Sequence, residues 1–334
     1  MNIIIPMAGR GTRLRPHTLT IPKPLIKIAG KPIVQRIVED LASSYHGTID
    51  EVAFVIGDFG REVEEELLKV AESVGAKGKI FYQQKALGTA HAVYCAAESL
   101  TGNCMIAFSD TLFKADFSFD ENEDGYIWCM RVPDPKAYGV VNLNDAGYIT
   151  EFVEKPETFV SDLAVVGIYY FKDGDGLKAE IKQIIDNDVK DKGEYQLTTA
   201  LENLKNSGLK FKPGTIEEWL DCGNKDSLVN ANQRILEFNK TKDLTDSTCV
   251  IENSVIIQPC FIGKNAKIHN SVVGPYVSIG EDSVLEHVVI SNSIIQNKSI
   301  LRYGVVQDSM VGSSAAYEST AMNLNIGDYS TLKN

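Results

Sequence analysis

The chain has little positive charge. Its 334 residues include 33 lysines and arginines against 45 aspartates and glutamates, which gives a net charge of -12 at pH 7. Nonspecific binding of nucleic acid or of an anionic membrane needs a basic face, so this balance argues against both partners. An acidic protein that handles phosphate groups must gather its cations locally, and residues 10–31 do so.

Long apolar runs and paired cysteines are also missing. No stretch approaches the roughly 20 apolar residues of a membrane span, and the first residues lack the basic and apolar regions of a secretion signal. The absence of Cys-x-x-Cys spacing disfavours a zinc or redox site and favours small core residues. We therefore expect a reduced, cytoplasmic chain without a membrane partner. The six cysteines are Cys95, Cys104, Cys129, Cys222, Cys249 and Cys260.

A glycine-rich cationic segment follows the first apolar run. Residues 2–8 predict a buried strand. Gly-Arg-Gly-Thr-Arg-Leu-Arg follows at residues 9–15, and Pro-Lys-Pro-Leu stands at 22–25. Glycines let backbone N–H groups approach phosphate closely, and Arg13, Arg15 and Lys23 add three cations. The combination suits a leaving triphosphate tail; the alternative is an ordinary turn with solvated arginines.

Two common phosphate loops do not fit this segment. A Walker loop needs Lys-Ser/Thr after its second glycine, where this chain has Thr12 and Arg13. The dinucleotide fingerprint needs a third glycine where this chain has Leu14. Both of these nucleotide folds are therefore disfavoured.

Strands and helices alternate in the first part of the chain. This order predicts an α/β fold with a mostly parallel, doubly wound, Rossmann-like sheet. Ligands of such sheets collect at the carboxyl ends of the strands, where Gly9, Gln83 and Asp110 fall. The expected strands are 2–8, 52–56, 79–83 and 104–108, and the expected helices are 32–42, 61–74 and 89–100.

The pattern changes after residue 125. Short strands at 126–132, 139–142 and 163–171 predict a partly antiparallel subdomain. Helical patterns return at 177–189, 196–206 and 227–238, and the polar stretch 239–247 is the expected linker. We therefore expect a catalytic domain over residues 1–238.

The remainder of the chain is repetitive. Twelve aliphatic residues recur every five or six positions, and a small or β-branched residue stands two positions before each, where we expect the chain to turn. This period predicts a hexapeptide-type parallel β-helix of about four three-sided coils over residues 248–313. Residues 314–334 lack the repeat and are expected to form a tail or cap. The aliphatic residues are Ile251, Ile257, Ile262, Ile268, Val273, Ile279, Leu285, Ile290, Ile295, Leu301, Val306 and Val311.

The two motifs together resemble the signature of the sugar-1-phosphate nucleotidylyltransferases, the NDP-sugar pyrophosphorylases. Further matches run across roughly the first 230 residues. Many members of this family carry a left-handed β-helix after the catalytic domain, which the repeat here resembles. Ala8-Gly9 stands where many members have two glycines and resembles the uridylyl enzymes that use glucose-1-phosphate.

The resemblance implies attack by a sugar-1-phosphate oxygen on the α-phosphorus of a nucleoside triphosphate. The attacking oxygen is already anionic, so catalysis consists of alignment and charge stabilisation. By resemblance Arg15 and Lys23 stabilise the pyrophosphate, with Arg13 as a third cation. Asp110 and Asp221 would hold Mg²⁺, although either alone is commonly a turn or cap residue.

The resemblance also divides the substrate contacts. Gln83 matches the glutamine that reads the base, because its amide can accept from N3–H and donate to O4 of a pyrimidine. His91 is expected to be a helix residue without a chemical role. The expected nucleotide-binding residues are Ala8, Gly9, Gly11, Thr12, Gln83 and Gly88. The expected sugar-phosphate residues are Gly139, Glu154, Lys155 and Gly167.

Several alternatives remain open on these residues. UTP or dTTP with glucose-1-phosphate is the favoured pair, and a GTP-using mannose-1-phosphate guanylyltransferase is the alternative. A non-catalytic sugar-nucleotide sensor is a further one. His269 and His287 raise the possibility of acyl transfer by the β-helix, but no loop insertion builds a pocket there. We favour a structural role for the β-helix in a homo-oligomer.

Overall fold

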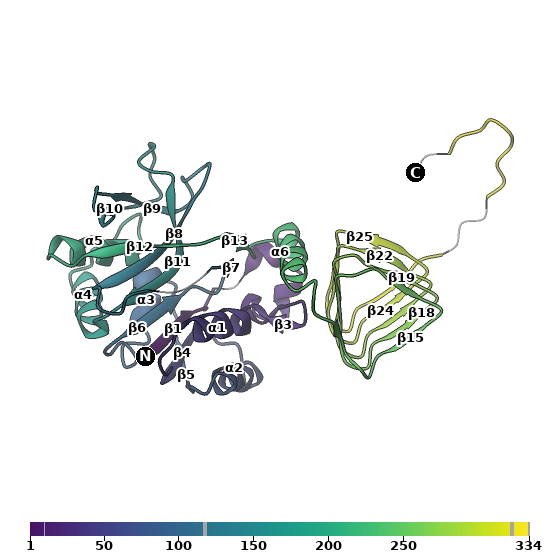
Figure 1. Ribbon diagram of the computed structural model, residues 1–334, viewed down its shortest axis with the longest axis horizontal. Coiled ribbons are helices and arrows are strands. Elements are labelled where there is room, and N and C mark those ends of the chain that lie inside the picture. Colours follow the sequence, from purple (N-terminus) through teal and green to yellow (C-terminus); the bar gives the residue numbers. More distant parts are fainter. Residues whose placement is uncertain (10, 116–118, 321–323, 333–334) are drawn as a thin grey trace. The chain divides into compact units, whose positions relative to one another are not determined.

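The computed structural model describes residues 1–9, 11–115, 119–320 and 324–332 (Figure 1). The chain forms two compact units. The N-terminal unit comprises Met1–Ile26 and Lys31–Asn224, and the C-terminal unit comprises Lys27–Gly30 and Lys225–Asn334. The catalytic domain expected from the sequence ran to residue 238, and the C-terminal unit includes the chain from Lys225 onward.

A nine-stranded sheet organises the described part of the N-terminal unit. The strand order β10-β9-β11-β6-β1-β4-β5, with β8 beside β11 and β12 beside β8, joins a parallel half to an antiparallel half. The strands of this sheet are β1 (Asn2–Pro6), β4 (Glu51–Ile56), β5 (Lys77–Tyr82), β6 (Cys104–Ala107), β8 (Gly125–Arg131), β9 (Gly139–Leu143), β10 (Ile149–Glu154), β11 (Leu163–Phe171) and β12 (Phe211–Thr215). The predicted α/β class with an antiparallel part is confirmed.

Five helices accompany this sheet within the described residues. They are α1 (Ile33–Ser44), α2 (Arg61–Ser73), α3 (Thr89–Tyr94), α4 (Gly174–Asp186) and α5 (Leu197–Asn206). Helix α3 ends earlier than predicted because Ala96 and Ala97 donate to carbonyls three residues back, which tightens the chain into turns. The strands that no sequence pattern predicted include β10, β12 and the short pair of β7 (Thr111–Lys114) with β13 (Glu218–Asp221).

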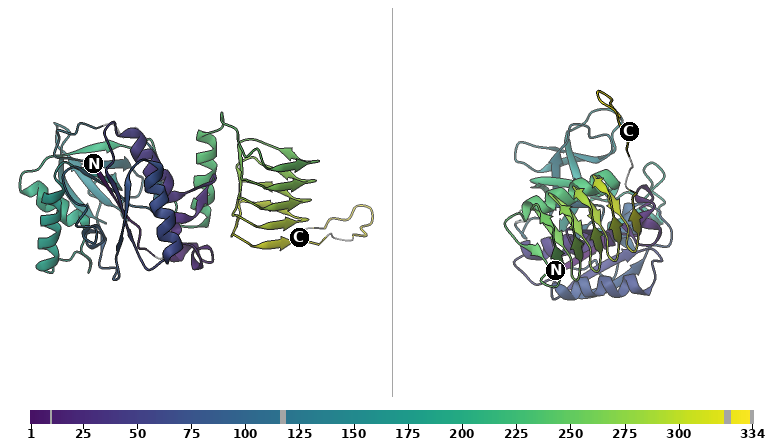
Figure 2. Two further views of the ribbon diagram at one scale, coloured as in Figure 1. Left: turned by 90° about the horizontal axis from the view of Figure 1, so that it is seen from below. Right: turned by 90° about the vertical axis from the view of Figure 1, so that its right-hand side faces the viewer.

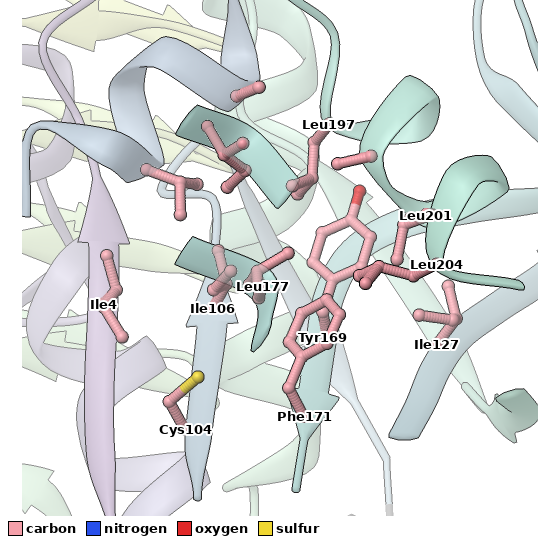
Figure 3. Packing of buried hydrophobic residues seen from close by; sticks show 14 of the residues in the cluster. Ile4, Cys104, Ile106, Ile127, Tyr169, Phe171, Leu177, Leu197, Leu201 and Leu204 are labelled. Carbon is pink, nitrogen blue, oxygen red and sulfur yellow. The ribbon is translucent and has the colours of Figure 1, made fainter. Parts of the chain in front are cut away.

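The main core lies between the sheet and helices α3, α4 and α5. Ile4, Ile106 and Tyr169 project from β1, β6 and β11 toward Leu177 of α4 and Leu201 of α5, and all five are buried (Figure 3). The alternate strand residues face the other side, where α2 packs against β4 and β5. Both faces of the sheet are therefore covered, as the near-continuous apolar strands require.

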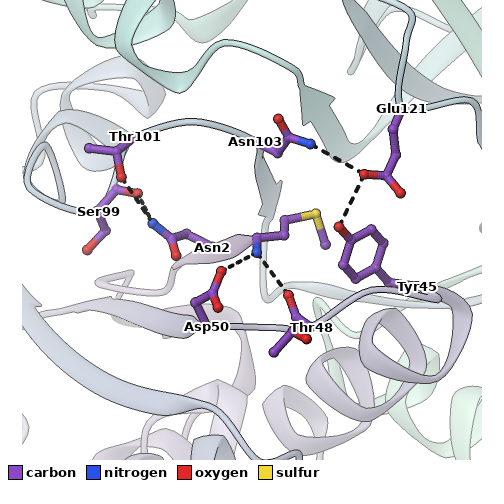
Figure 4. A network of polar contacts seen from close by, with 9 residues as sticks. Asn2, Tyr45, Thr48, Asp50, Ser99, Thr101, Asn103 and Glu121 are labelled. Atoms are coloured by element: carbon purple, nitrogen blue, oxygen red, sulfur yellow. Dashed lines mark hydrogen bonds and ion pairs between the residues drawn. The ribbon is translucent and has the colours of Figure 1, made fainter.

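Polar contacts tie together the amino-terminal edge of the sheet. The Asn2 side chain donates to the carbonyl of Ser99 at 2.9 Å (Figure 4). Glu121 accepts from Tyr45 at 3.2 Å and from Asn103 at 3.4 Å. These paired groups lie at the opposite ends of the strands from Gly9 and Asp110, which leaves the carboxyl ends for ligands.

The C-terminal unit consists of helix α6 (Lys225–Phe238) followed by a parallel β-helix. It also includes strand β2 (Lys27–Ile28) from near the start of the chain, which pairs with β3 (Lys31–Pro32). Its strands stack into three flat faces of five, five and four strands (Figure 2), which confirms the predicted three-sided repeat. The strands are β14 (Leu244–Thr245), β15 (Val250–Glu252), β16 (Val255–Ile256), β17 (Cys260–Ile262), β18 (Lys267–His269), β19 (Val272–Val273), β20 (Val277–Ile279), β21 (Val284–Glu286), β22 (Val289–Ser291), β23 (Ile294–Ile295), β24 (Ile300–Arg302), β25 (Val305–Gln307), β26 (Met310–Val311) and β27 (Ala316–Glu318).

The ends of the β-helix extend beyond the predicted range. Strand β14 falls within the expected linker and pairs with β17, and β27 falls within the expected tail and pairs with β24. Within the described residues each of these end strands pairs with one neighbour, so their inward residues need not follow the aliphatic repeat.

Two details of the predicted repeat are wrong. In its second unit the structure turns Ile256 inward against the core, and leaves Val255 57% and Ile257 43% exposed. The turns also lie one residue earlier than expected. A residue with positive φ, such as Asn270 or Lys298, immediately precedes a buried small residue, here Ser271 or Ser299.

Candidate active site

The cationic loop after β1 buries one lysine at the carboxyl edge of the sheet. The Lys23 side chain donates to the backbone carbonyl of Asp110 at 3.0 Å, and Lys23 is only 8% exposed. Gly11 has a φ of 58°, and a Cβ there would lie 2.9 Å from the Lys23 Cβ. Glycine thus provides both the left-handed turn and the space that Lys23 occupies.

The charge state of Lys23 results from opposing effects. Burial lowers the pKa of the Lys23 ammonium, and nearby negative groups, led by Asp110 and including Asp221, raise it. A buried lysine held by a backbone carbonyl and close to two carboxylates provides a positive charge with little water around it. Such a charge stabilises phosphate oxygens more strongly than a solvated one.

A first cavity of about 400 Å³ opens beside this lysine. Gly9, Gln83 and Asp110 all line it, so the prediction that these strand-end residues gather on one rim is confirmed. All six residues expected to bind nucleotide line this cavity: Ala8, Gly9, Gly11, Thr12, Gln83 and Gly88. Arg13 and Lys23 contribute its cations.

A second cavity of about 530 Å³ adjoins the first. Arg13, Thr89, Phe108 and Asp110 line both, so the two spaces meet at these residues. The second cavity is also lined by Gly139, Glu154, Lys155 and Asp221. A nucleotide in one cavity and a sugar phosphate in the other would meet at Arg13 and Asp110.

The two candidate metal ligands come together through the β7–β13 pair. Asp221 lies opposite Thr111 in the antiparallel register, and the Cys222 N–H donates to the Asp110 carbonyl at 3.2 Å. Within the described residues no group of three or more histidine, cysteine or acidic side chains is placed to hold a metal. Two carboxylates beside a cavity that is lined by cations still fit Mg²⁺, which takes few protein ligands and completes its shell with water and substrate phosphates.

The second cavity has a close-packed wall. The Thr198 hydroxyl donates to the Glu154 carboxylate at 3.0 Å, and a Cβ at Gly139 would lie 3.1 Å from the same oxygen. Lys155 Nζ lies 3.4 Å from the other Glu154 oxygen. Lys192 donates to the backbone carbonyls of Glu154 and Lys155 at 3.1 and 2.5 Å, so it supports this wall from outside the cavity.

Two expected site residues are not among those that line the cavities. Arg15 is exposed, and Gly167 instead accepts a backbone hydrogen bond from Phe108 at 3.0 Å with a φ of 89°. Arg10, within the glycine-rich motif, lies outside the described residues.

Sequence reasoning missed two polar groups in the second cavity. Among the described residues, the Thr111 hydroxyl and the Trp219 indole nitrogen are buried without a hydrogen-bond partner, and both residues line this cavity. Buried polar atoms without partners are unfavourable unless a ligand satisfies them. Trp219 stands two residues before Asp221, so the motif that identified the aspartate could have drawn attention to it.

None of the helices in the described ranges is long and apolar enough to cross a membrane. All six cysteines are free, and burial raises the pKa of the Cys222 thiol to about 12. A thiol of such high pKa is not a ready nucleophile at neutral pH.

Comparisons with known proteins agree with this geometry. The nucleotidyl transferase family matches residues 2–237. The low-salt glycan biosynthesis nucleotidyltransferase Agl11 of Haloferax volcanii is 30% identical over all of both chains. A glucose-1-phosphate thymidylyltransferase of Streptomyces griseus is 29% identical, covering 99% of this chain and 98% of the relative.

A solved structure described as apo UDP-glucose pyrophosphorylase shares the fold. It superposes with a TM-score of 0.59 at 21% identity, covering 71% of this chain and 98% of the other. The family match covers more than half of the chain, and the Haloferax relative aligns along its full length. The protein is therefore an enzyme of the nucleotidyl transferase family, which confirms the resemblance to the sugar-1-phosphate nucleotidylyltransferases.

Proposed function

We propose that this enzyme joins glucose-1-phosphate to UTP or dTTP and releases an NDP-sugar and pyrophosphate. The observation that carries the proposal is the pair of adjoining cavities that share Arg13 and Asp110. One cavity has glycines, the buried Lys23 and the exposed Arg13, which suit a triphosphate. The other has a carboxylate and unpartnered buried donors suited to a polyhydroxyl ligand.

In the proposed reaction a sugar-phosphate oxygen attacks the α-phosphorus, and the bond from that phosphorus to the bridging oxygen breaks. The attacking phosphate is already ionised, so no side chain has to remove a proton. Lys23, Arg13 and Arg15 would neutralise the departing pyrophosphate. Lys23 uses one of its three N–H groups on the Asp110 carbonyl, which fixes its position and leaves two for phosphate oxygens.

Asp110 and Asp221 would hold Mg²⁺, which supplies positive charge to the phosphate oxygens when bound. We expect Asp221→Asn to raise the Mg²⁺ concentration needed for half-maximal activity by at least about tenfold, because a carboxylate ligand becomes a neutral amide. Asp226→Asn, at an exposed position of α6, is the matched control. An unchanged magnesium titration for Asp221→Asn would contradict the assignment.

A panel of nucleotides tests the proposed substrates. We expect pyrophosphate release from glucose-1-phosphate with UTP or dTTP, measured as initial rates on the full chain. A strong preference for GTP with mannose-1-phosphate would replace this proposal by a guanylyltransferase. Nucleotide binding without turnover of any pair would favour a sugar-nucleotide sensor.

We also propose that the β-helix joins two copies of the chain. On its four-stranded face Val255, Val272, Val289 and Val305 stack in register on the outer side, and Val305 is 81% exposed. A continuous apolar column on a flat solenoid face is suited to a self-complementary contact. Val289→Lys should then lower the mass measured by light scattering to that of a monomer, while an outward change on another face, Lys267→Glu, should not. A monomeric wild-type protein would refute this assembly.

A further inference from the structure

Gln83 has both of its amide hydrogens occupied by the protein. Its Nε2 donates to the Gly88 carbonyl at 3.3 Å and lies 3.1 Å from Nδ1 of His91. A carbonyl oxygen can only accept a hydrogen bond, so the amide nitrogen must be the atom that faces Gly88. The amide therefore cannot turn over without placing two oxygens against each other.

The second contact requires an unprotonated Nδ1 on His91. An amide N–H can donate to this nitrogen only if the ring is neutral and carries its proton on Nε2. Burial lowers the pKa of His91, which favours the neutral ring. The Cys95 sulfur, 3.9 Å from the same nitrogen, is the other side chain recorded near it among the described residues.

His91 supports Gln83 from outside the cavity. Gln83, Gly88 and Thr89 line the first cavity, whereas His91 does not. His91 lies in the first turn of helix α3. The N-cap of this helix, Gly88, packs against Tyr195, and a Cβ added to Gly88 would lie 2.4 Å from the Tyr195 carbonyl oxygen. His91 and Gly88 thus approach the same amide from one rigid element.

With both Nε2 hydrogens engaged, the donation to O4 that was expected from the sequence is not available, and Oε1 is the part of the Gln83 amide left to meet a ligand. We propose that His91 is a positioning residue that makes Gln83 present a hydrogen-bond acceptor to the nucleotide base. A fixed acceptor at Gln83 selects bases that carry a ring N–H. This inference rests on the proposed function and narrows the set of nucleotides that the enzyme accepts.

The selection follows from the chemistry of the bases. Uracil and thymine carry N3–H and guanine carries N1–H, and each can donate to a fixed carbonyl oxygen. Cytosine N3 and adenine N1 carry lone pairs at the equivalent ring position, so Oε1 would repel them. An amide free to rotate could instead donate its own N–H to cytosine and lose this discrimination.

Two substitutions of His91 separate positioning from mere packing. His91→Asn keeps an acceptor, because its Oδ1 branches from the same Cγ as Nδ1, and His91→Leu fills similar space without one. We compare kcat/KM for UTP with CTP, and for dTTP with dCTP, using the full-length enzyme and glucose-1-phosphate. The melting temperature of each variant reports on its fold.

We expect wild-type enzyme to prefer the ring N–H nucleotide strongly in each pair. His91→Leu should reduce that preference by about tenfold, the effect of one hydrogen bond, mainly through KM, and His91→Asn should restore it. If His91→Leu lowered kcat/KM equally for both nucleotides of a pair, or left the preference between them unchanged, the inference would be overturned. Equal use of UTP and CTP by wild type would overturn it while the proposed function stands. Failure of wild type with every nucleotide would remove the proposed function and this inference together.

Discussion

The buried hydroxyl groups of the two units differ in their hydrogen bonding. In the β-helix the buried serines are hydrogen-bonded within the protein: Ser283 donates to the Gln296 carbonyl and accepts from the Ser299 N–H. In the N-terminal unit the Thr111 hydroxyl has no recorded protein partner in the described ranges and lies on a cavity. Satisfied polar groups stabilise a fold, whereas unsatisfied ones beside a cavity indicate where a ligand completes the bonding.

The largest effect should come from the buried cation of the N-terminal unit. Lys23→Met keeps the length of the side chain and removes its charge, so we expect the initial rate of pyrophosphate release to fall by about 10²-fold or more. The melting temperature should change little, because a buried ammonium is costly to desolvate. Lys69→Met, on the exposed face of α2, is the control. Wild-type turnover would remove Lys23 from the mechanism.

A change in the core of the β-helix should lower stability and leave catalysis unaffected, the reverse of the effect expected for Lys23→Met. Leu285→Ala removes a fully buried side chain and should lower the free energy of unfolding by about 2–5 kcal/mol. The change should leave kcat unaltered. The outward neighbour Val284→Ala should cost less than half as much in the same calorimetric measurement. A loss of kcat matching that of Lys23→Met would show that this comparison of the two units is mistaken.

Thr111→Val tests the unsatisfied hydroxyl directly. Valine has the same shape, so stability should hold or rise slightly, since an unpaired buried hydroxyl is lost. The KM for glucose-1-phosphate should rise by about tenfold if the hydroxyl bonds to the substrate. Ser283→Ala is the contrasting variant, and it should destabilise by about 1–3 kcal/mol because the Ser299 N–H loses its acceptor. Equal destabilisation by both changes would remove the distinction.

The smallest effect concerns the turns of the β-helix. Lys298 has a φ of 59°, and the preceding coils hold Asp282 and Asn265 at the corresponding turns. Left-handed backbone is less strained for asparagine than for lysine, so Lys298→Asn should stabilise by about 0.5–1 kcal/mol. Lys264→Asn, at an exposed residue outside the positive-φ set, should be neutral. A lower melting temperature for Lys298→Asn would contradict this account.

Sequence reasoning succeeded where local pattern determines position. Gly9, Gln83 and Asp110 each follow an apolar strand, and parallel strands bring such residues to one edge. The β7–β13 pair was not predicted because it joins two short segments about a hundred residues apart, and a local sequence pattern does not indicate such a pairing.

The register of the first coil was ambiguous for a related reason. Val255, Ile256 and Ile257 are all aliphatic, so the sequence alone does not say which of them points inward. Stacking of Ile256 on Val273 of the next coil settles the choice. The Gln83–His91 contact was likewise out of reach, because it depends on side-chain rotamers at two separate elements.

The hydrogen bonds of Asn232 determine which segments must be kept together when the C-terminal unit is exchanged between related proteins. The Asn232 side chain accepts from the Ala29 N–H and the Ser278 hydroxyl and donates to the Tyr276 carbonyl. The C-terminal unit is thus built from helix α6, the β-helix and four residues near the start of the chain. A graft that begins after residue 247 would separate parts that hydrogen-bond to one another, so a working chimera must transplant residues 27–30 together with everything from Lys225 onward.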